Sequence, residues 1–375
     1  MIYSLFVILN QPEDVNFDIF QRCCKKMFRN KQVLLKIRKQ LKKTAKDKKI
    51  LFVSKGESSA STRYRALNYF DAFQLEGWRP DHVSMKHSFS KIKLLKAARQ
   101  ADVVIILRKT FSRCFMRFLT ICSKRLIFDF DDAIFCNSNG AFSATRNRRF
   151  IQTVRGCNRV FAGNDYLSEI AGKYNSDVIT IPTSIDPEKY AATVEKPGDH
   201  IDLVWIGSSS TRKYIENILP VLELAADVIP GLRLKIVADF DLSSNHLKTT
   251  AVKWSKKNES YDLGSAHIGI APMSNDPWTK GKCGLKVLQY MAAGLPVISS
   301  YSGVNREIVK HGVTGFFAET DKQWQRAIKN LAKDSILRKK MGTAGREIIL
   351  HKYSTNVAFS AMQKAVNQLI IKNEL

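Results

Sequence analysis

Long hydrophobic runs are absent from this chain of 375 residues. The longest apolar runs that the chain does contain, such as Ile2–Leu9, fall well short of the ~20 apolar residues that a membrane-spanning helix needs. We therefore expect no transmembrane segment. Ile2–Leu9 also has no basic region before it and no small-residue cleavage site after it. This pattern argues against a secretory signal peptide.

Cysteine is scarce and irregularly placed. The chain has seven cysteines, an odd number, and no C-x-x-C pair. That spacing fits neither a disulfide framework nor a zinc site, and we therefore expect a reducing compartment.

Acidic residues are also few, with 34 Asp and Glu against 60 Lys and Arg, for a net charge of +26. Residues 1–195 hold 35 basic and 18 acidic side chains, whereas residues 196–375 hold 25 and 16. A positive field of this size indicates an anionic partner: membrane headgroups, nucleic acid or a phosphorylated substrate.

The strongest excess lies in a basic leader, residues 1–47, which we treat as a separate segment. Arg22–Lys49 has 13 basic residues and one acid, Asp47. Met27, Phe28 and other apolar residues recur there at helical spacing. The pattern predicts a helix lying in an anionic membrane interface. The alternative is a solvated basic helix packed loosely on the domain.

From Ile50 onward, short apolar runs alternate with longer helical patterns. The predicted strands are Ile50–Val53, Val103–Leu107, Leu126–Phe130, Arg159–Ala162, Val178–Ile181, Leu203–Ile206, Leu232–Val237, His267–Ala271, Pro296–Ser299 and Gly315–Ala318. A linker pattern at Glu195–His200 divides the series in two. The sequence therefore predicts an α/β protein of two doubly wound, Rossmann-like domains, 48–195 and 200–350. In such folds ligands bind at the carboxyl ends of the strands, here in a cleft between the domains.

One candidate binding segment is Trp205–Glu216, in which an apolar strand meets Gly207 and then a helical pattern. The glycine permits a tight turn, and Ser209 and Thr211 can satisfy free N–H groups where the helix begins. The same helix start attracts phosphate, and Arg212 supplies positive charge. A plain helix cap with solvated basic residues is the alternative.

A second segment, Asp276–Ser300, carries more information. A glycine-containing loop leads into a helical pattern from Leu285 that ends at Gly294. Loop amides at Gly284, together with Lys282 and Lys286, would form a diphosphate cradle. Gln289 lies one turn further along the same face, where it can bind a ribose hydroxyl.

These residues carry a family resemblance. Residues 281–318, beginning G-K-C-G-L-K-V-L-Q-Y-M, resemble the donor-binding region of family 4 retaining glycosyltransferases, and the G-K-C-x-x-K-x-L-Q-Y-M pattern resembles that of a bacterial branch. M-G-T-A-G-R-E at Met341–Glu347 is similar to the tail of the family. The resemblance spans roughly 48–372 and implies the GT-B architecture, with a C-terminal helix at 353–372 that crosses back to the first domain.

The resemblance also assigns roles. Two glutamates of the family, eight positions apart, would fall on Gly281 and Gln289. Gln289 can still hold the nucleotide ribose, whereas Gly281 cannot contact the sugar. The resemblance implies a metal-independent enzyme that needs no cofactor, because its nucleotide-sugar is a substrate.

Three carboxylates end the strand in L-I-F-D-F-D-D, namely Asp129, Asp131 and Asp132. Asp129-Phe130-Asp131 matches the D-x-D metal motif of single-domain glycosyltransferases, but the tandem architecture and the resemblance speak against a metal site. We expect Asp131 and Asp132 to replace a His-Asp pair of the family and to act in catalysis. The alternative is a helix cap and a salt bridge to Arg63 or Arg65.

The loop after the first strand, Gly56–Arg65, matches the place of a glycine-rich loop in the family. Its polar side chains would bind the donor diphosphate or an anionic acceptor, and these are Ser58, Ser59, Arg63 and Arg65. A capped helix with exposed arginines is the alternative. A basic stretch, Arg146–Arg159, would bind a phosphate-rich acceptor or lipid headgroups, unless it is a solvated face.

The sequence thus predicts a retaining glycosyltransferase of the hexosyltransferase type. It would move a sugar from a nucleotide-sugar to a cell-envelope glycan or a lipid-linked acceptor, in the cytoplasm, peripherally on the inner face of the cell membrane. A nucleotide-sugar epimerase of the same fold is one alternative, although it would need no basic leader. A basic nucleic-acid-binding protein is the other, but the chain has no nucleic-acid-binding motif, and we expect no nucleic-acid partner.

Overall fold

The computed structural model describes residues 48–86, 90–190, 194–196 and 198–371. One compact unit contains Lys49–Phe70 and the chain from Pro80 onward. Asp71–Arg79 do not belong to this unit. Within Asp71–Arg79, the edge of the Phe73 ring meets Trp78, with centroids 6.1 Å apart. The leader predicted at 1–47 lies outside the described residues.

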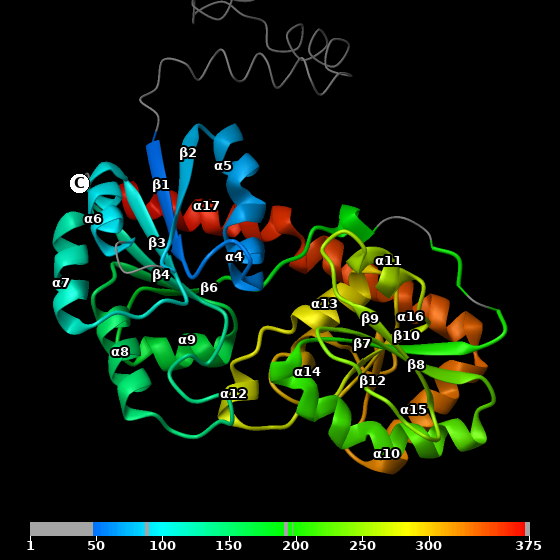
Figure 1. Cartoon of the computed structure of the whole chain (residues 1–375). Coiled ribbons are helices and arrows are strands. Elements are labelled where there is room, and N and C mark those ends of the chain that lie inside the picture. The colour runs from blue at the N-terminus through cyan, green and yellow to red at the C-terminus, as the bar shows by residue number, and fades with distance from the viewer. Residues whose placement is uncertain (1–47, 87–89, 191–193, 197, 372–375) are drawn as a thin grey trace, which may run out of the picture. The chain divides into compact units, whose positions relative to one another are not determined.

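The first sheet has six strands in the order β2–β1–β3–β4–β5–β6, and the pairings from β1 to β6 are parallel (Figure 1). Every residue of β3, β4 and β5 is buried, as expected for strands covered on both faces by helices. The strands are β1 (Lys48–Ser54), β2 (Trp78–Ser84), β3 (Val103–Leu107), β4 (Leu126–Phe130), β5 (Arg159–Ala162) and β6 (Val178–Thr180).

Helices connect these strands and close an aromatic core. The rings of Phe128 and Phe130 on β4 stack with centroids 5.2 Å apart, and Phe150 of α8 meets Phe130 edge-on at 5.2 Å. The helices are α4 (Ala60–Arg65), η2 (Leu67–Tyr69), α5 (Phe70–Leu75), α6 (Ser90–Gln100), α7 (Arg113–Cys122), α8 (Ala144–Arg155), α9 (Asp165–Gly172) and η3 (Pro187–Tyr190).

The second sheet repeats this architecture with six parallel strands in the order β12–β11–β10–β7–β8–β9. Its strands are β7 (Ile201–Ile206), β8 (Leu232–Ala238), β9 (Lys248–Lys253), β10 (Ile268–Ala271), β11 (Val297–Ser299) and β12 (Gly315–Phe317). Its helices are η4 (Ser209–Thr211), α10 (Arg212–Val228), α11 (Glu259–Gly264), α12 (Pro277–Lys280), α13 (Leu285–Ala292), α14 (Asn305–Ile308), α15 (Asp321–Lys333), α16 (Ser335–Ile348) and the π-helix η5 (Ile349–Tyr353).

The last helix, α17 (Thr355–Ile371), returns to residues of the first sheet (Figure 1). The guanidinium of Arg125, just before β4, donates to the carbonyls of Leu369 at 3.3 Å and Ile370 at 3.2 Å. Arg159 of β5 donates to the carbonyl of Ala365. The carbonyls of Leu369 and Ile370 are among the last four of the helix, which have no partner within the helix, so the bonds from Arg125 satisfy them.

The predicted α/β class with two parallel sheets is confirmed. The sequence missed the edge strands β2 and β9, because these two are largely polar and lack the apolar run that marks a buried strand. The domain boundaries at 48–195, 200–350 and 353–372 stay a prediction. No helix in the described part of the chain is long and apolar enough to cross a membrane.

Candidate active site

A cavity of about 580 Å³ opens where strands of both sheets end. Arg108 follows β3, Asp131 follows β4, Gly207 follows β7, Asp239 follows β8 and Pro272 follows β10, and all five residues line it. All the lining residues belong to one compact unit. Its volume is in the range of small-molecule sites, and its place is where doubly wound folds bind ligands.

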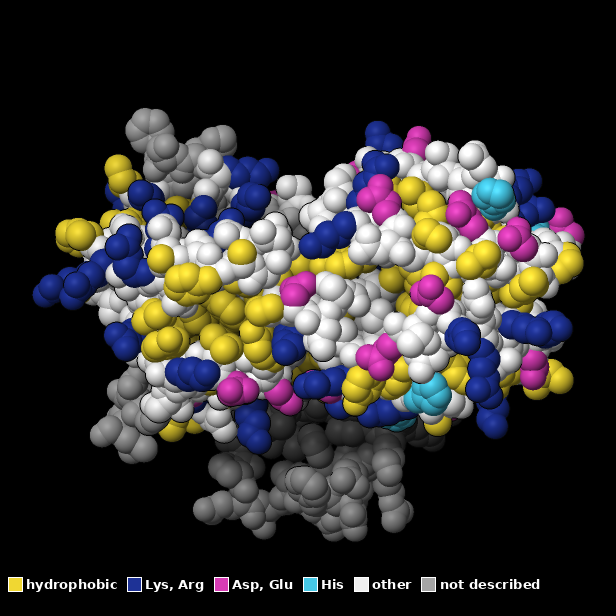
Figure 2. Space-filling view, turned by 90° about the horizontal axis from the view of Figure 1, so that it is seen from below, with side chains coloured by type: hydrophobic (Ala, Val, Ile, Leu, Met, Phe, Trp, Pro, Cys, Tyr) yellow, Lys and Arg dark blue, Asp and Glu magenta, His cyan; other side chains and the backbone are white. Residues whose placement is uncertain are grey.

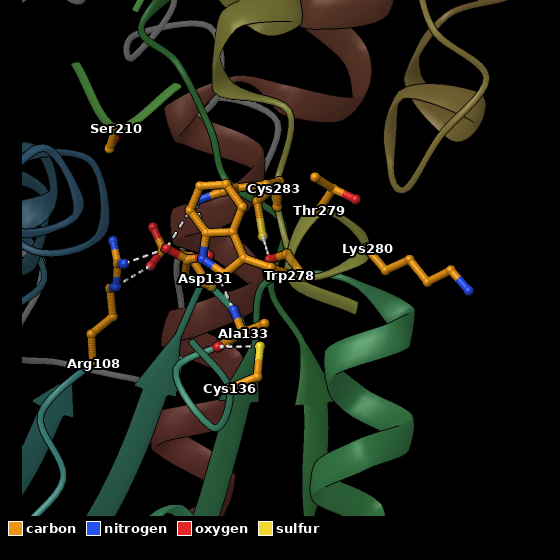
Figure 3. A network of polar contacts seen from close by, with 12 residues as sticks. Arg108, Asp131, Ala133, Cys136, Ser210, Trp278, Thr279, Lys280 and Cys283 are labelled. Carbon is orange, nitrogen blue, oxygen red and sulfur yellow. Dashed lines mark hydrogen bonds and ion pairs between the residues drawn. The ribbon is translucent and has the colours of Figure 1, made fainter. Parts of the chain in front are cut away.

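One end of the cavity holds a charged cluster (Figure 3). Arg108 Nη2 donates to Asp132 Oδ2 at 2.5 Å, and Arg108 Nε lies 3.3 Å from Asp131 Oδ1. Lys282 Nζ lies 3.1 Å from each carboxylate oxygen of Asp132. Burial alone would lower the pKa of Arg108, but the charges of Asp131 and Asp132 raise it. Two cations and two anions balance, so this end offers donors and acceptors to sugar hydroxyl groups without a net charge.

The backbone at Arg108 aims its side chain into this cluster. Among the residues that the structure describes, Arg108 is the one non-glycine residue with a positive φ, +51°. Its N–H donates to the carbonyl of Asp129 at 2.8 Å. A left-handed conformation costs an L-residue about 1 kcal/mol, and such strain persists where surrounding contacts impose it. The ion pairs of Arg108 are such contacts.

The loop that carries Lys282 is closely packed. Lys282 Nζ lies 3.5 Å from the centre of the Trp278 ring, so the ring holds the ammonium over its face. Asn164 Nδ2 donates to the carbonyls of Lys280 and Lys282, at 3.1 and 2.9 Å. A Cβ at Gly281 would come within 2.5 Å of the Cβ of Ala133. Position 281, to which the resemblance assigns a family glutamate, therefore has no room for a side chain.

A second part of the cavity is suited to phosphate. Gly284 precedes α13 with a φ of +69°, a left-handed conformation that favours glycine. One residue into α13, Lys286 Nζ lies 3.3 Å from Thr211 Oγ1 and 3.9 Å from the centre of the Trp205 ring. Burial lowers the pKa of Lys286 to about 7, and the charge of Lys282 adds to the shift. A helix N-terminus beside a desolvated lysine is a favourable place for an anion.

A third part of the cavity is organised around a buried carboxylate, Glu259. It accepts hydrogen bonds from the hydroxyls of Tyr64 at 3.2 Å and Tyr190 at 2.5 Å, and from Trp254 Nε1 at 2.7 Å. Gln289 Nε2 donates to the Tyr64 hydroxyl at 3.4 Å. Burial raises the pKa of Tyr64 to about 12, and the charge of Glu259 contributes. Of these side chains, Tyr64, Trp254, Glu259 and Gln289 line the cavity and form a polar wall that can recognise hydroxyl groups.

Comparison with known proteins shows which families this chain is similar to. Residues 186–348 match the family model described as glycosyl transferases group 1. This segment is therefore similar to the domain of group 1 glycosyltransferases. Human alpha-1,3/1,6-mannosyltransferase ALG2 is 32% identical over 112 residues, which are 30% of this chain and 23% of that relative. The match thus covers less than a quarter of that relative's length.

Solved structures resemble nearly the whole chain at low identity. Sucrose-phosphate synthase from Thermosynechococcus elongatus has a TM-score of 0.66 at 14% identity, covering 87% of this chain and 100% of that one. Anabaena HepE in complex with UDP and glucose has a TM-score of 0.64 at 14% identity, covering 86% and 100%. A glycosyltransferase from Rickettsia africae has a TM-score of 0.67 at 14% identity, covering 87% and 99%. These likenesses show the fold and confirm the two-domain GT-B class.

The cavity brings together most of the site residues that the sequence predicted. Those that line it, from the matched segment and from the first half, are Ser58, Arg63, Asp131, Asp132, Gly207, Thr211, Lys282, Gly284, Leu285, Lys286 and Gln289. Their roles in binding and catalysis stay a prediction.

Four predicted site residues do not line the cavity. Arg65 is buried, and its Nε and Nη2 donate to the two oxygens of Asp129 at 2.5 and 2.9 Å. This pair is the salt bridge that the sequence left as an alternative. Arg212 pairs with Glu216 one helical turn away. The other two, Ser209 and Ser59, lie where helices begin. The backbone N–H of Ser209 donates a hydrogen bond to the Asp239 carboxylate, and the hydroxyls of Ser59 and Ser61 are hydrogen-bonded to each other.

The sequence did not single out several cavity residues, and those that make the contacts described above include Arg108, Tyr64, Trp254, Glu259 and Trp278. Arg108 directly follows a predicted strand. Because ligands bind at the carboxyl ends of strands in doubly wound folds, inspecting the residue after every predicted strand would have found it. Trp278 lies inside the segment already identified as informative. Glu259 and Trp254 lie in a stretch without a motif, and no sequence signal marks them. In the described ranges no group of three or more His, Cys, Asp or Glu is arranged to hold a metal ion.

Proposed function

We propose that this protein is a glycosyltransferase that moves a sugar from a nucleotide-sugar to an acceptor hydroxyl. One observation carries the proposal. The matched domain contributes Lys286, Thr211 and the start of α13 to the same cavity that holds Asp131 and Asp132 from the first half. A phosphate site and a neutral sugar site in one cavity fit the two ends of a nucleotide-sugar.

The donor diphosphate would lie against the start of α13. There the free N–H groups of the helix, the Lys286 ammonium and the Thr211 hydroxyl can all donate to phosphate oxygens. The same groups would stabilise the charge that develops on the diphosphate as it leaves, which is the largest catalytic contribution we expect. HepE, a structural neighbour, was solved with UDP and glucose, which supports a nucleotide-sugar donor and makes UDP the first probe.

The polar wall around Glu259 would receive the nucleoside. Gln289 and Tyr64 present an amide and a hydroxyl to the cavity, next to the indole of Trp254. An amide and a hydroxyl can each donate to and accept from a ribose diol. Gln289 would therefore perform the role that the resemblance gives to a glutamate.

At the sugar end, Asp131 and Asp132 would accept hydrogen bonds from donor hydroxyls. Both carboxylates are paired with Arg108, and Asp132 also with Lys282. Because pairing with cations makes a carboxylate a weaker nucleophile, a covalent glycosyl-enzyme is not favoured here. We propose retention by attack on the face from which the diphosphate departs, with the two carboxylates supporting an oxocarbenium-like transition state. The cations of the cavity would serve in place of a divalent metal.

The acceptor would be a cell-envelope glycan or a lipid-linked saccharide. The first half of the chain carries the larger positive charge, which suits a phosphate-rich or membrane-bound acceptor. The predicted leader would hold the protein on the cytoplasmic face of the cell membrane. The name of the relative ALG2, a mannosyltransferase, supports transfer of a hexose.

The test is a panel of nucleotide-sugars incubated with the full chain, with and without membrane extract, scored for release of the nucleoside diphosphate. We expect one donor to be turned over, faster with extract. Lys286→Met should abolish turnover, whereas Lys235→Met should not, because Lys235 lies on β8 and donates to Ser265 outside the cavity wall. A sugar nucleotide converted to an isomer without diphosphate release would indicate an epimerase instead.

A further inference from the structure

Three neighbouring helices present a strongly basic surface that the proposed chemistry does not use. α7 packs against both α6 and α8, and none of the three contains Asp or Glu. All of their basic side chains are exposed: Lys91, Lys93, Lys96, Arg99, Arg113, Arg117, Arg146, Arg148, Arg149 and Arg155. We call this the α6–α8 surface.

Apolar side chains occupy the middle of the α6–α8 surface. On α7, Cys114, Phe118 and Ile121 follow one another at intervals of four and three, which places them on one helical face. Phe118 is 60% exposed and Ile121 is 74% exposed, while Met116 and Leu119 of the same helix are buried in the core. The face therefore points to solvent although it is apolar, and such faces mark interaction sites.

The apolar stripe and the basic residues are interleaved. Arg113 and Arg117 directly precede Cys114 and Phe118 along α7, and Ile92 on α6, 61% exposed, lies between Lys91 and Lys93. Figure 2 shows yellow and dark blue atoms side by side on its left side, which holds these helices. An apolar stripe flanked by cations is the pattern of an element that lies in a membrane interface.

We propose that the α6–α8 surface docks the protein on an anionic lipid bilayer, with Phe118 and Ile121 inserted among the headgroups. Charge complementarity selects this occupant, because the three helices carry ten exposed cations and no acid. Binding of a nucleic acid would use the cations and would leave the apolar stripe in water. The surface lies on described residues and is distinct from the predicted leader.

The surface also lies near the cavity along the chain, and here the inference rests on the proposed function. Arg108 lines the cavity, and α7 begins at Arg113, five residues later. Five residues span at most ~18 Å. A bilayer held at α7 would therefore lie next to the helix whose start is within ~18 Å of the cavity residue Arg108, so that a lipid-linked acceptor could be delivered to the cavity from the membrane.

The first test measures binding of the full chain to vesicles of phosphatidylglycerol and phosphatidylcholine by sedimentation. Each cation near an anionic surface raises partitioning about fivefold, so Arg113→Glu with Arg117→Glu should lower it by about 25-fold or more. The matched control is Lys329→Glu with Lys333→Glu on α15, two exposed lysines at the same spacing, which should change it little. Equal losses in both double variants would overturn the proposal.

The second test detects insertion directly, even if other segments dominate the affinity. An environment-sensitive maleimide fluorophore is placed on Cys114, which is exposed, in a full chain with Cys23, Cys24 and Cys122 changed to Ser. A control probe is placed on Ile336→Cys of α16, 80% exposed in the wild type, with Cys114→Ser added. Anionic vesicles should shift only the emission of the Cys114 probe to the blue. No shift, or equal shifts, would refute insertion of α7.

Two further outcomes separate this inference from the proposed function. The charge-reversed variant should keep the wild-type affinity for UDP in solution, because neither arginine lines the cavity. If the vesicle results hold but no donor is turned over, the proposed function fails and the docking surface stands. If the variant changes the oligomeric state and not vesicle binding, the surface is a contact between copies of the chain and the proposal fails.

Discussion

Lys286 gives the most direct test of the proposed donor site, because its environment makes nucleotide binding depend on pH. The pKa of Lys286 is lowered to about 7, chiefly by burial, so in the free protein the ammonium loses its proton near neutrality. A bound diphosphate favours the charged form, and binding must then take up a proton. Between pH 7.5 and 8.5 the affinity for UDP should fall about eightfold, with uptake of close to one proton at pH 8.5.

The assay is titration calorimetry with UDP at both pH values, in buffers of different ionisation enthalpy. The β-phosphate of UDP titrates near pH ~6, so it contributes little in this range. Lys286→Met should remove both the proton uptake and the pH dependence, and should weaken binding at pH 7.5 by ~2 kcal/mol, the worth of a charge-assisted hydrogen bond. Lys235→Met, with the same change outside the cavity wall, should retain both.

The reasoning is refuted by either of two results: a wild-type affinity that stays constant from pH 7.5 to 8.5, or a Lys286→Met variant that takes up as many protons as the wild type. The stability of the free protein gives an independent check. An unfolded lysine titrates near ~10.4, so between pH 7 and 10 the unfolded chain holds more protons at this position. This group should therefore make the fold more stable as the pH rises, and Lys286→Met should remove that contribution.

Three further predictions concern other parts of the molecule. Arg65→Met should lower the free energy of unfolding by about 3–5 kcal/mol, because it leaves Asp129 as an unpaired buried charge; a change below 1 kcal/mol by chemical denaturation would contradict this. Glu259→Gln should destabilise the fold by ~1–3 kcal/mol and weaken UDP binding, since three donors lose a charged acceptor; unchanged melting and affinity would argue against the polar wall. Turnover should survive EDTA; a loss that manganese restores would replace the proposed mechanism with a metal-dependent one.

A fourth prediction concerns the leader, and it is independent of the α6–α8 surface. Deletion of residues 1–46 should leave UDP binding intact, because β1 begins at Lys48. Sedimentation with phosphatidylglycerol vesicles should fall, and should fall further at high salt. A truncated chain that pellets as well as the full chain would show that the leader is not the anchor.

The amino-acid sequence alone determined the fold class and the core strands. β3, β4 and β5 match their predicted bounds residue for residue, because a strand buried on both faces is predominantly apolar, and that signal is local. The loop into α13 was equally clear, since the left-handed turn at Gly284 needs glycine. β2 and β9 escaped detection because these two edge strands are largely polar, and their place is set by pairing with a neighbour.

Only the tertiary structure decided which charges meet. Arg65 and Arg63 are two residues apart, yet one is buried against Asp129 and the other lines the cavity. Lys282 reaches Asp132 across 150 positions of sequence, and Tyr64 reaches Glu259 across 195. Helix and strand patterns depend on neighbours a few residues away, whereas an ion pair or a buried hydrogen bond depends on which strand ends the fold brings together. For that reason the sequence could propose the carboxylates and the lysines of this site, and the folded chain alone determined their partners.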